Sequence, residues 1–374
     1  MTPILNNPKG KEDSIKGNET DWVDHVKAML HRRYPVARIA LGIIAIIVVM
    51  AISAGRGAIE IPIDVVAIII MDKLRMAEPS ADLPSVWETI VWNIRLPRVI
   101  TAGIVGSALA LSGATFQGIF RNPLADPYLI GVASGAGLAV TIIIISPIPN
   151  YLWGINLLPP VAFLGALLAV AIAYLLSNNV DPRSTNSLVL AGVAVTFMAS
   201  SMTTFLMLQA SPDMRPILNW LLGGVSQGGW DRPAWLLPYV LPCGIFIMLH
   251  SRTLNVLQLD RDHAMQLGIN VDRTKVSLIV CASLATAAAV SVSGMIPFVG
   301  LMAPHCVRLL WGGDHRNILP MSTVVGALLL IFSDMLARTI LSPEELPVGV
   351  ITAFFGAPFF VLLLRRNKTL GEQV

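Results

Sequence analysis

The sequence has little charge. Lys, Arg, Asp and Glu together make up 13% of its 374 residues, while hydrophobic residues make up 55%. A soluble domain carries about 25% charged residues, so this chain cannot cover a soluble fold of its size with polar side chains. Its mean hydropathy of +0.70 also excludes an intrinsically disordered chain, because disorder needs low hydrophobicity. The class that remains is a membrane protein that crosses the bilayer many times.

Other absences narrow the chemistry. The three cysteines all lie in apolar stretches without CxxC spacing, so neither a disulfide nor a metal site is expected. No phosphate-binding Gly-x-x-x-x-Gly-Lys-[Ser/Thr] loop is present, so the chain is not expected to hydrolyse ATP, and we predict no cofactor bound by it. The net charge of +3 is too small to favour nucleic acid as a partner.

An intramembrane enzyme is also not expected. Ser134 or Ser293 could act as a nucleophile only beside a paired base on a neighbouring helix. The candidate bases are His250 and His305, and the sequence gives neither of them a partner.

Ten apolar runs follow a polar leader at residues 1–35. They cover residues 36–54, 97–120, 128–146, 158–177, 188–210, 234–250, 275–292, 298–311, 318–340 and 348–364. Each run is continuously apolar, whereas the strands of a membrane barrel alternate, and a segment in lipid must satisfy its own backbone as a helix. Small residues crowd the second and third runs, which predicts close helix packing there. The sequence therefore predicts an all-α polytopic membrane protein with a flexible cytoplasmic leader at 1–35, a ten-span domain at 36–366 and a cytoplasmic tail at 367–374.

The distribution of Lys and Arg predicts the orientation. With the N-terminus inside, 18 of the 26 Lys and Arg residues fall in cytoplasmic segments and 8 fall outside. Because positively charged residues accumulate on the cytoplasmic side, both termini are expected in the cytoplasm.

A short pattern near the end of the second run recurs near the end of the seventh, about 181 residues later. The matching positions are Ser112, Gly113, Phe116, Gly118 and Pro123 in one copy, and Ser293, Gly294, Phe298, Gly300 and Pro304 in the other. The two runs would cross the membrane in opposite directions. The recurrence is compatible with an inverted repeat of spans 2–5 and 7–10, an organisation common in transporters, and equally with a chance recurrence of small residues.

Acidic residues are nearly absent from the runs. Asp334 is the only acid deep inside one, and Arg338 lies four residues on, on the same helix face. Carriers driven by protons or sodium place ionisable groups in mid-membrane. The sequence thus favours an energy source elsewhere, and an ion-coupled secondary transporter remains the alternative.

The polar segment at 253–273, between the sixth and seventh runs, is cytoplasmic by the charge count and amphipathic. Gly268 can end one short helix, and Asp272 can cap the next. A helical protrusion of this kind offers a cytoplasmic motor subunit something to hold, whereas long loops without a function are uncommon.

Several motifs occur in a characteristic order. They are Arg95-Leu-Pro-Arg98, Ser112-Gly-Ala-Thr-Phe-Gln117, Asn122-Pro-Leu-Ala-Asp-Pro127, Leu129-Ile-Gly-Val-Ala-Ser-Gly-Ala-Gly137, Ala264-Met-Gln-Leu-Gly268, Gly300-Leu-Met-Ala-Pro-His305, Asp314-His-Arg316 and Leu346-Pro-Val-Gly349. From about residue 36 to 366 the chain resembles the permease subunits of ABC importers for iron chelates, haem and cobalamin (the BtuC/FecCD type).

The resemblance implies a binding-protein-dependent importer in the cell inner membrane. It implies ten spans, a homodimer surrounded by lipid, two cytoplasmic ATP-binding subunits that hold ATP-Mg, and an extracytoplasmic substrate-binding protein.

The resemblance also implies residue roles. Arg95, Arg98 and Arg338 match arginines that dock the binding protein, although plain anchoring in the membrane interface remains open for them. The segment 253–273 matches paired coupling helices that contact the ATPase, with Leu257, Asp260, Ala264, Leu267 and Gly268 as its contact residues. Thr185 and Asn186 match a cytoplasmic gate.

The fifth run offers a smooth, weakly polar wall for a pathway. We expect its lining to include Met198, Ser201, Met202 and Thr203. Such a wall lets a bulky chelate slide without holding it, and it suits a ferric siderophore, haem or cobalamin equally.

Overall fold

A computed structural model describes residues 35–76, 84–152, 155–180, 185–210, 214–225, 229–259 and 261–371. The leader predicted at 1–35, apart from its last residue, lies outside the described residues, as does Asp260. The chain divides into two compact units, Met1–Leu41 and Gly42–Val374.

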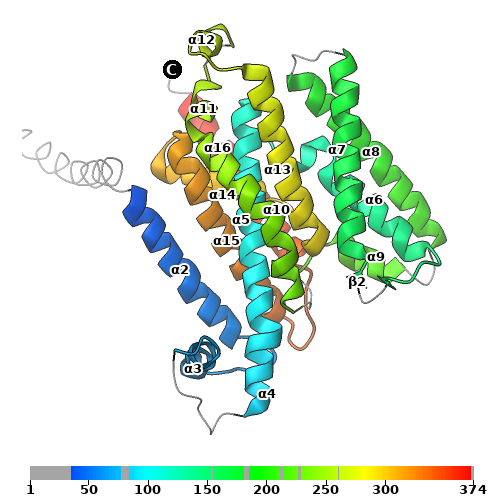
Figure 1. Cartoon of the computed structure of the whole chain (residues 1–374), viewed down its shortest axis with the longest axis vertical. Helices are drawn as coiled ribbons and strands as arrows, with labels where there is room; N and C mark the ends of the chain where they lie inside the picture. Colours follow the sequence, from blue (N-terminus) through cyan, green and yellow to red (C-terminus); the bar gives the residue numbers. More distant parts are fainter. Residues whose placement is uncertain are drawn as a thin grey trace, which may run out of the picture. The chain divides into compact units, whose positions relative to one another are not determined.

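The described residues are almost wholly helical (Figure 1). The α-helices are α2 (Pro35–Gly55), α3 (Ile63–Lys73), α4 (Ser85–Glu88), α5 (Leu96–Phe120), α6 (Val132–Ile145), α7 (Leu158–Val180), α8 (Thr185–Gln209), α9 (Met214–Leu221), α10 (Asp231–Leu249), α11 (Ser251–Val256), α12 (Arg261–Gln266), α13 (Val271–Ser293), α14 (Val299–Trp311), α15 (His315–Thr339) and α16 (Val348–Gly371). A π-helical turn, η2 (Thr89–Arg95), leads into α5, and a 3-10 turn, η3 (Pro127–Ile130), precedes α6. Strands β1 (Tyr151–Leu152) and β2 (Ile155–Asn156) pair antiparallel in a small hairpin.

The predicted all-helical architecture is confirmed, whereas the number of spans stays a prediction. Each of the ten apolar runs coincides with one helix, namely α2, α5, α6, α7, α8, α10, α13, α14, α15 or α16. Among the described residues, seven helices are long and apolar enough to cross a bilayer. The other three runs gave shorter helical or apolar segments: α6 has 14 residues, α14 has 13, and the apolar part of α16 covers Val348–Leu363.

Local backbone chemistry explains why α6 is short. The third run begins as η3. The backbone N–H of Tyr128, in the first turn of η3, donates to the Asp126 carboxylate at 2.8 Å. Gly131 then takes a φ of +90°, a conformation that suits glycine. The α-helix can therefore begin only at Val132, after this turn.

The helix α5 lies at the centre of the unit and packs on α10, α13, α14 and α15. Its crossing with α15 depends on glycine. A Cβ atom on Gly106 would overlap the carbonyl of Gly326, and one on Gly326 would overlap the carbonyl of Gly106. Gly135 of α6 and Gly165 of α7 meet in the same way. The close packing predicted for the second and third runs is confirmed, because only small residues let backbones approach so closely.

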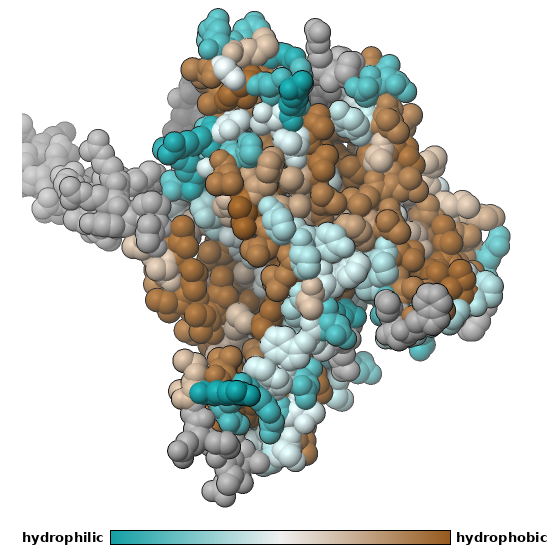
Figure 2. Space-filling model, in the orientation of Figure 1, coloured by the Kyte–Doolittle hydropathy of each residue, from teal (hydrophilic) through white to brown (hydrophobic). Residues whose placement is uncertain are grey.

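The two ends of the unit differ. One end carries α11 and α12 and is called the α12 end below; the opposite end carries α4, the β1–β2 hairpin and α9 and is called the α4 end (Figure 1). Figure 2 shows hydrophobic residues over α7 and α8 and hydrophilic residues around α12. Large side chains such as Leu168 and Phe197 are exposed on α7 and α8. An apolar surface of this extent suits lipid or a protein partner.

Candidate functional site

The predicted coupling segment forms two short helices at the α12 end. The first, α11, buries Leu254 and is followed by the buried Leu257, while α12 buries Ala264. Leu267 is 62% exposed just beyond α12. Gly268 follows with a φ of +79° and ends the helix as predicted. The segment therefore has a buried inner face and an outward-facing apolar residue.

The predicted cap of the next helix is wrong. The side chain of Asn270, not Asp272, accepts the hydrogen bond from the backbone N–H of Arg273 at 3.1 Å and caps α13. Asp272 lies in the first turn instead and pairs with Arg261 at 2.6 Å. Both residue types suit a cap, so the sequence alone could not choose between positions two residues apart.

Polar side chains tie α11 to the start of α15. The amide of Asn255 donates from Nδ2 to Asp314 Oδ1 at 2.7 Å. Its Oδ1 accepts from the backbone N–H of His315 at 2.9 Å. Arg316 also donates to Asp314, and this contact lowers the pKa of Asp314 to about 2. Asp314 is therefore an anion at neutral pH and a strong acceptor for Asn255.

A second set of bonds ties the same segment to the end of α5. Arg121 donates from Nε to the carbonyl of Leu257 at 2.9 Å. Gln258 donates from Nε2 to the carbonyl of Gly118 at 2.7 Å. The Gln258 side chain thus caps the Gly118 carbonyl, one of the last carbonyls of α5, which a helix end otherwise leaves unsatisfied. Sequence reasoning missed Asn255, Gln258 and Arg121, although it had singled out the Asp314-His-Arg316 motif.

The predicted docking arginines gather at the α4 end, and each is buried. Arg95 donates from Nη1 to the carbonyls of Ala54 and Gly55, both at 3.0 Å. Because Arg95 lies in η2, just before α5, it holds the end of α2 against the start of α5. Its partners are backbone carbonyls of its own chain.

Arg98 and Arg338 share one carboxylate. Arg98 donates to Oδ1 of Asp334 and Arg338 donates to Oδ2, each at 3.0 Å. Asp334 is 0% exposed. Arg98 also contacts Glu345 at 2.9 Å, and Arg338 contacts the Ser53 hydroxyl at 2.8 Å. A cluster of this kind joins α2, α5 and α15, and buried charges of both signs compensate each other there. The sequence indicated the Asp334–Arg338 spacing but not Arg98, which lies 236 residues away. The docking role itself stays a prediction.

The expected pathway wall is partly assembled on α8. Met198, Ser201 and Met202 line a groove of about 640 Å³ between α6, α7 and α8. Thr203 is buried instead, and its hydroxyl donates to the carbonyl of Ala199 at 2.9 Å. Thr185 begins α8, and Asn186 is exposed beside it. The residues proposed for a gate and for the wall therefore belong to one helix.

The residues considered for an enzyme are not assembled. Ser134 donates to the carbonyl of Gly131 and Ser293 to that of Ala289. Within the part of the chain that the structure describes, neither hydroxyl is hydrogen-bonded to a histidine. The arrangement gives neither serine a base.

Comparisons with known proteins give a consistent answer. A family model described as the FecCD transport family matches residues 43–366. YvrB of Bacillus subtilis, an uncharacterised ABC transporter permease, is 37% identical over 92% of this chain and 97% of its own. The cobalamin import permease BtuC of Halobacterium salinarum is 42% identical over 76% of each chain. The hemin transport permease HmuU of Yersinia pestis is 37% identical over 80% of this chain and 93% of its own. A solved inward-facing structure assigned to the metal-chelate type of ABC transporter superposes with a TM-score of 0.76 at 30% identity, covering 88% of this chain and 99% of that one.

Proposed function

The chain belongs to the FecCD transport family, and from that premise we propose that it is the permease subunit of a binding-protein-dependent ABC importer. Its substrate is a metal chelate: a ferric siderophore, haem or cobalamin. The names of similar proteins, which include a cobalamin and a hemin permease, support this substrate class. Energy comes from ATP-Mg on two partner subunits, and the chain itself performs no catalysis.

The observation that carries the proposal is the α11–α12 segment. It protrudes at one end, exposes Leu267, and is bonded to both α5 and α15 through Asn255 and Gln258. A force applied to this segment reaches the two central helices through short hydrogen bonds rather than through a loose loop. This arrangement suits a permease driven from outside its own fold.

The ion-coupled alternative is less well supported. Asp334 is the buried acid among the described residues, and both of its oxygens already accept from arginines. A transported proton or sodium ion would have to displace a guanidinium to reach it. Carriers need an ionisable group that can exchange its partner during transport.

We further propose the topology and assembly. Ten helices span the membrane, the α12 end faces the cytoplasm, and both termini lie there. Spans 2–5 and 7–10 form an inverted repeat; the opposite directions of α5 and α13 in Figure 1 support it. Two copies meet around a central pathway, and the exposed groove on α8 supports this assembly. Met198, Ser201 and Met202 line the pathway, and Thr185 and Asn186 gate it.

A docking role for the arginines fits their geometry through Glu345. This residue is 46% exposed and occupies one side of the Arg98 guanidinium. A carboxylate on the binding protein can replace it there, because Arg98 keeps Asp334 as a second partner. Docking would thus exchange one carboxylate for another without leaving a buried charge unpaired.

Reconstituted uptake tests the proposal directly. Proteoliposomes that contain the chain, the ATPase subunits and the binding protein should accumulate at least one of the three chelates only when ATP is hydrolysed. Uptake that follows an imposed proton or sodium gradient without ATP would instead establish the secondary transporter.

Association with the ATPase supplies a matched control. Leu267→Asp should weaken binding of the ATPase subunit, because it places a charge where an apolar contact is expected. Leu341→Asp alters a similarly exposed leucine just beyond α15, toward the α4 end. This variant should leave binding of the ATPase subunit unchanged. Equal effects of the two variants would contradict the coupling role of the α12 end. Single reporter cysteines near Asp262 and Glu345 should label from inside and outside respectively, and the reverse result would overturn the orientation.

A further inference from the structure

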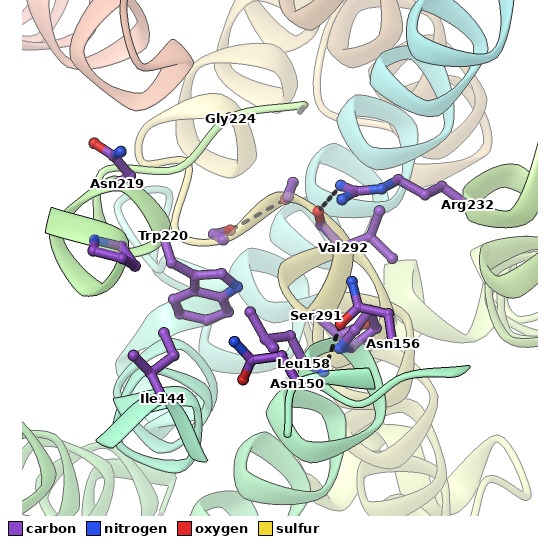
Figure 3. A pocket seen from close by; sticks show the side chains of 14 residues that line it. Ile144, Asn150, Asn156, Leu158, Asn219, Trp220, Gly224, Arg232, Ser291 and Val292 are labelled. Atoms are coloured by element: carbon purple, nitrogen blue, oxygen red, sulfur yellow. Dashed lines mark hydrogen bonds between the residues drawn. The ribbon is translucent and has the colours of Figure 1, made fainter. Parts of the chain in front are cut away.

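A polar cavity lies at the α4 end, and none of its lining residues belongs to the arginine cluster or to the α8 groove. Its volume is about 260 Å³. Its wall comes from the segment around the β1–β2 hairpin, α9, the first turn of α10 and the last turn of α13, and Ile144 of α6 and Leu158 of α7 complete it. Figure 3 shows Trp220 of α9 at its centre and Arg232 of α10 at its edge.

Arg232 brings a positive charge to this cavity, and no acid among the described residues pairs with it. Its Nη1 donates to the backbone carbonyl of Val292 at 2.8 Å (Figure 3). In the ranges that the structure describes, its side chain makes no other hydrogen bond and no ion pair. A guanidinium has five N–H donors, so most of them are available. Arg98 and Arg338, by contrast, each face a carboxylate.

The other polar groups of the wall are neutral and include donors. The Oδ1 atom of Asn156 accepts from the backbone N–H of Leu158 at 3.0 Å. The NH₂ group of Asn156 has no hydrogen-bond partner among the residues that the structure describes. The indole of Trp220 is a donor only, and Asn150 adds a second amide. Of the described residues that line the cavity, none is Asp or Glu. A single cation among neutral donors is an arrangement that attracts an anion.

The guanidinium and the size of the cavity define the ligand. The planar pair of N–H donors on the Arg232 guanidinium matches the two oxygens of a carboxylate. Pockets that hold whole drug-sized ligands measure about 300–1,000 Å³, so this cavity accepts an arm of a chelate and not its body. It also lies beside α9, which follows the pathway helix α8 in the chain.

We propose that the Arg232 cavity is a subsite for a free carboxylate on the transported chelate, which it engages at the outer mouth of the pathway. The assignment to transport rests on the proposed function, while the binding of a carboxylate does not. The subsite favours substrates with peripheral carboxylates over substrates whose periphery carries only uncharged amides.

The test uses citrate as the probe and the full chain in nanodiscs. Asn219 lines the cavity and is exposed, so Asn219→Cys, with the three native cysteines replaced, reports access through its rate of maleimide labelling. Citrate should slow this labelling several-fold, and trimethyl citrate, which lacks the charges, should not. Arg232→Gln should raise the citrate concentration for half-protection about tenfold or more, because it removes a charge-assisted bond.

Two further variants keep the result interpretable. Arg215→Gln removes the same charge from an exposed arginine of α9 that does not line the cavity, and it should leave protection intact. Arg232→Lys keeps the charge and loses the fork, so its protection should fall between those of the wild type and Arg232→Gln. If Arg232→Gln does not fold, the comparison of Arg232→Lys with Arg215→Gln decides.

Absence of protection by citrate in the wild type, or equal protection in Arg232→Gln, would overturn the subsite. Equal protection by trimethyl citrate would do the same, because it would show recognition of shape without charge. Failure of ATP-driven uptake with intact citrate protection would refute the importer and leave the subsite standing.

Discussion

Replacing Asp334 by Asn should destabilise the protein strongly, and the cluster around it sets the size of the effect. The substitution keeps the shape of the side chain and removes its charge. Asp334 is fully buried, and Arg98 and Arg338 each donate to it at 3.0 Å. Breaking a buried ion pair by removing one partner costs about 3–5 kcal/mol, because the remaining charge is uncompensated.

The remaining contacts move the expected value toward the lower end of that range. Arg98 retains Glu345, and Arg338 retains the Ser53 hydroxyl and the carbonyl of Arg56. We therefore expect a loss of about 3 kcal/mol in the free energy of unfolding, which corresponds to about a hundredfold change in the folding equilibrium. Reversible unfolding in mixed micelles, followed by circular dichroism, measures it.

The matched control is Asp272→Asn. It removes a carboxylate from an ion pair with Arg261 that is largely exposed, and exposed pairs contribute about 1 kcal/mol or less. A loss below about 1 kcal/mol for Asp334→Asn, equal to that of Asp272→Asn, would refute the reasoning. Adding Arg338→Gln to Asp334→Asn should recover part of the loss, since it removes one of the two stranded charges.

Three further changes have expected outcomes. Leu267→Pro removes a backbone N–H that donates to a backbone carbonyl one turn earlier at 3.2 Å. The variant should abolish transport and substrate-stimulated ATP hydrolysis while the chain stays inserted in the membrane. Transport that is still coupled to ATP hydrolysis would exclude the α12 end as the contact with the ATPase. Glu345→Gln should tighten association with the binding protein about 1.5- to 5-fold, because it frees one side of Arg98 and a part-exposed ion pair contributes up to about 1 kcal/mol. Titration of the nanodisc complex with the binding protein measures this affinity. Weaker association would mean that Glu345 itself is a docking residue. Gly106→Ala should cost about 1–3 kcal/mol of unfolding free energy, because its methyl group overlaps the carbonyl of Gly326, and an unchanged midpoint in the unfolding titration would contradict the tight α5–α15 crossing.

Composition and local pattern were enough to predict the helices. Continuous apolar runs leave the backbone no partner in lipid except its own helix, and each run became one. Gly268 ends α12 because glycine adopts the left-handed conformation without steric cost, and this preference depends on that one residue. The ordered motifs indicated the family, which the family model and the relatives then confirmed. These features depend on residues close together in the chain, so the sequence was sufficient for them.

The tertiary structure alone decided which side chains meet. Arg98 and Asp334 are separated by 236 residues, and Asn255 and Asp314 by 59, so no local pattern could pair them. Arg232 has no acidic partner in the described part of the chain, and the elements packed around it decide this. The sequence alone does not distinguish an arginine that is buried in an ion pair from one that is anchored in the membrane interface or one that is open to a cavity. Its environment is set by distant segments of the chain, and packing brings those segments together only in the folded protein.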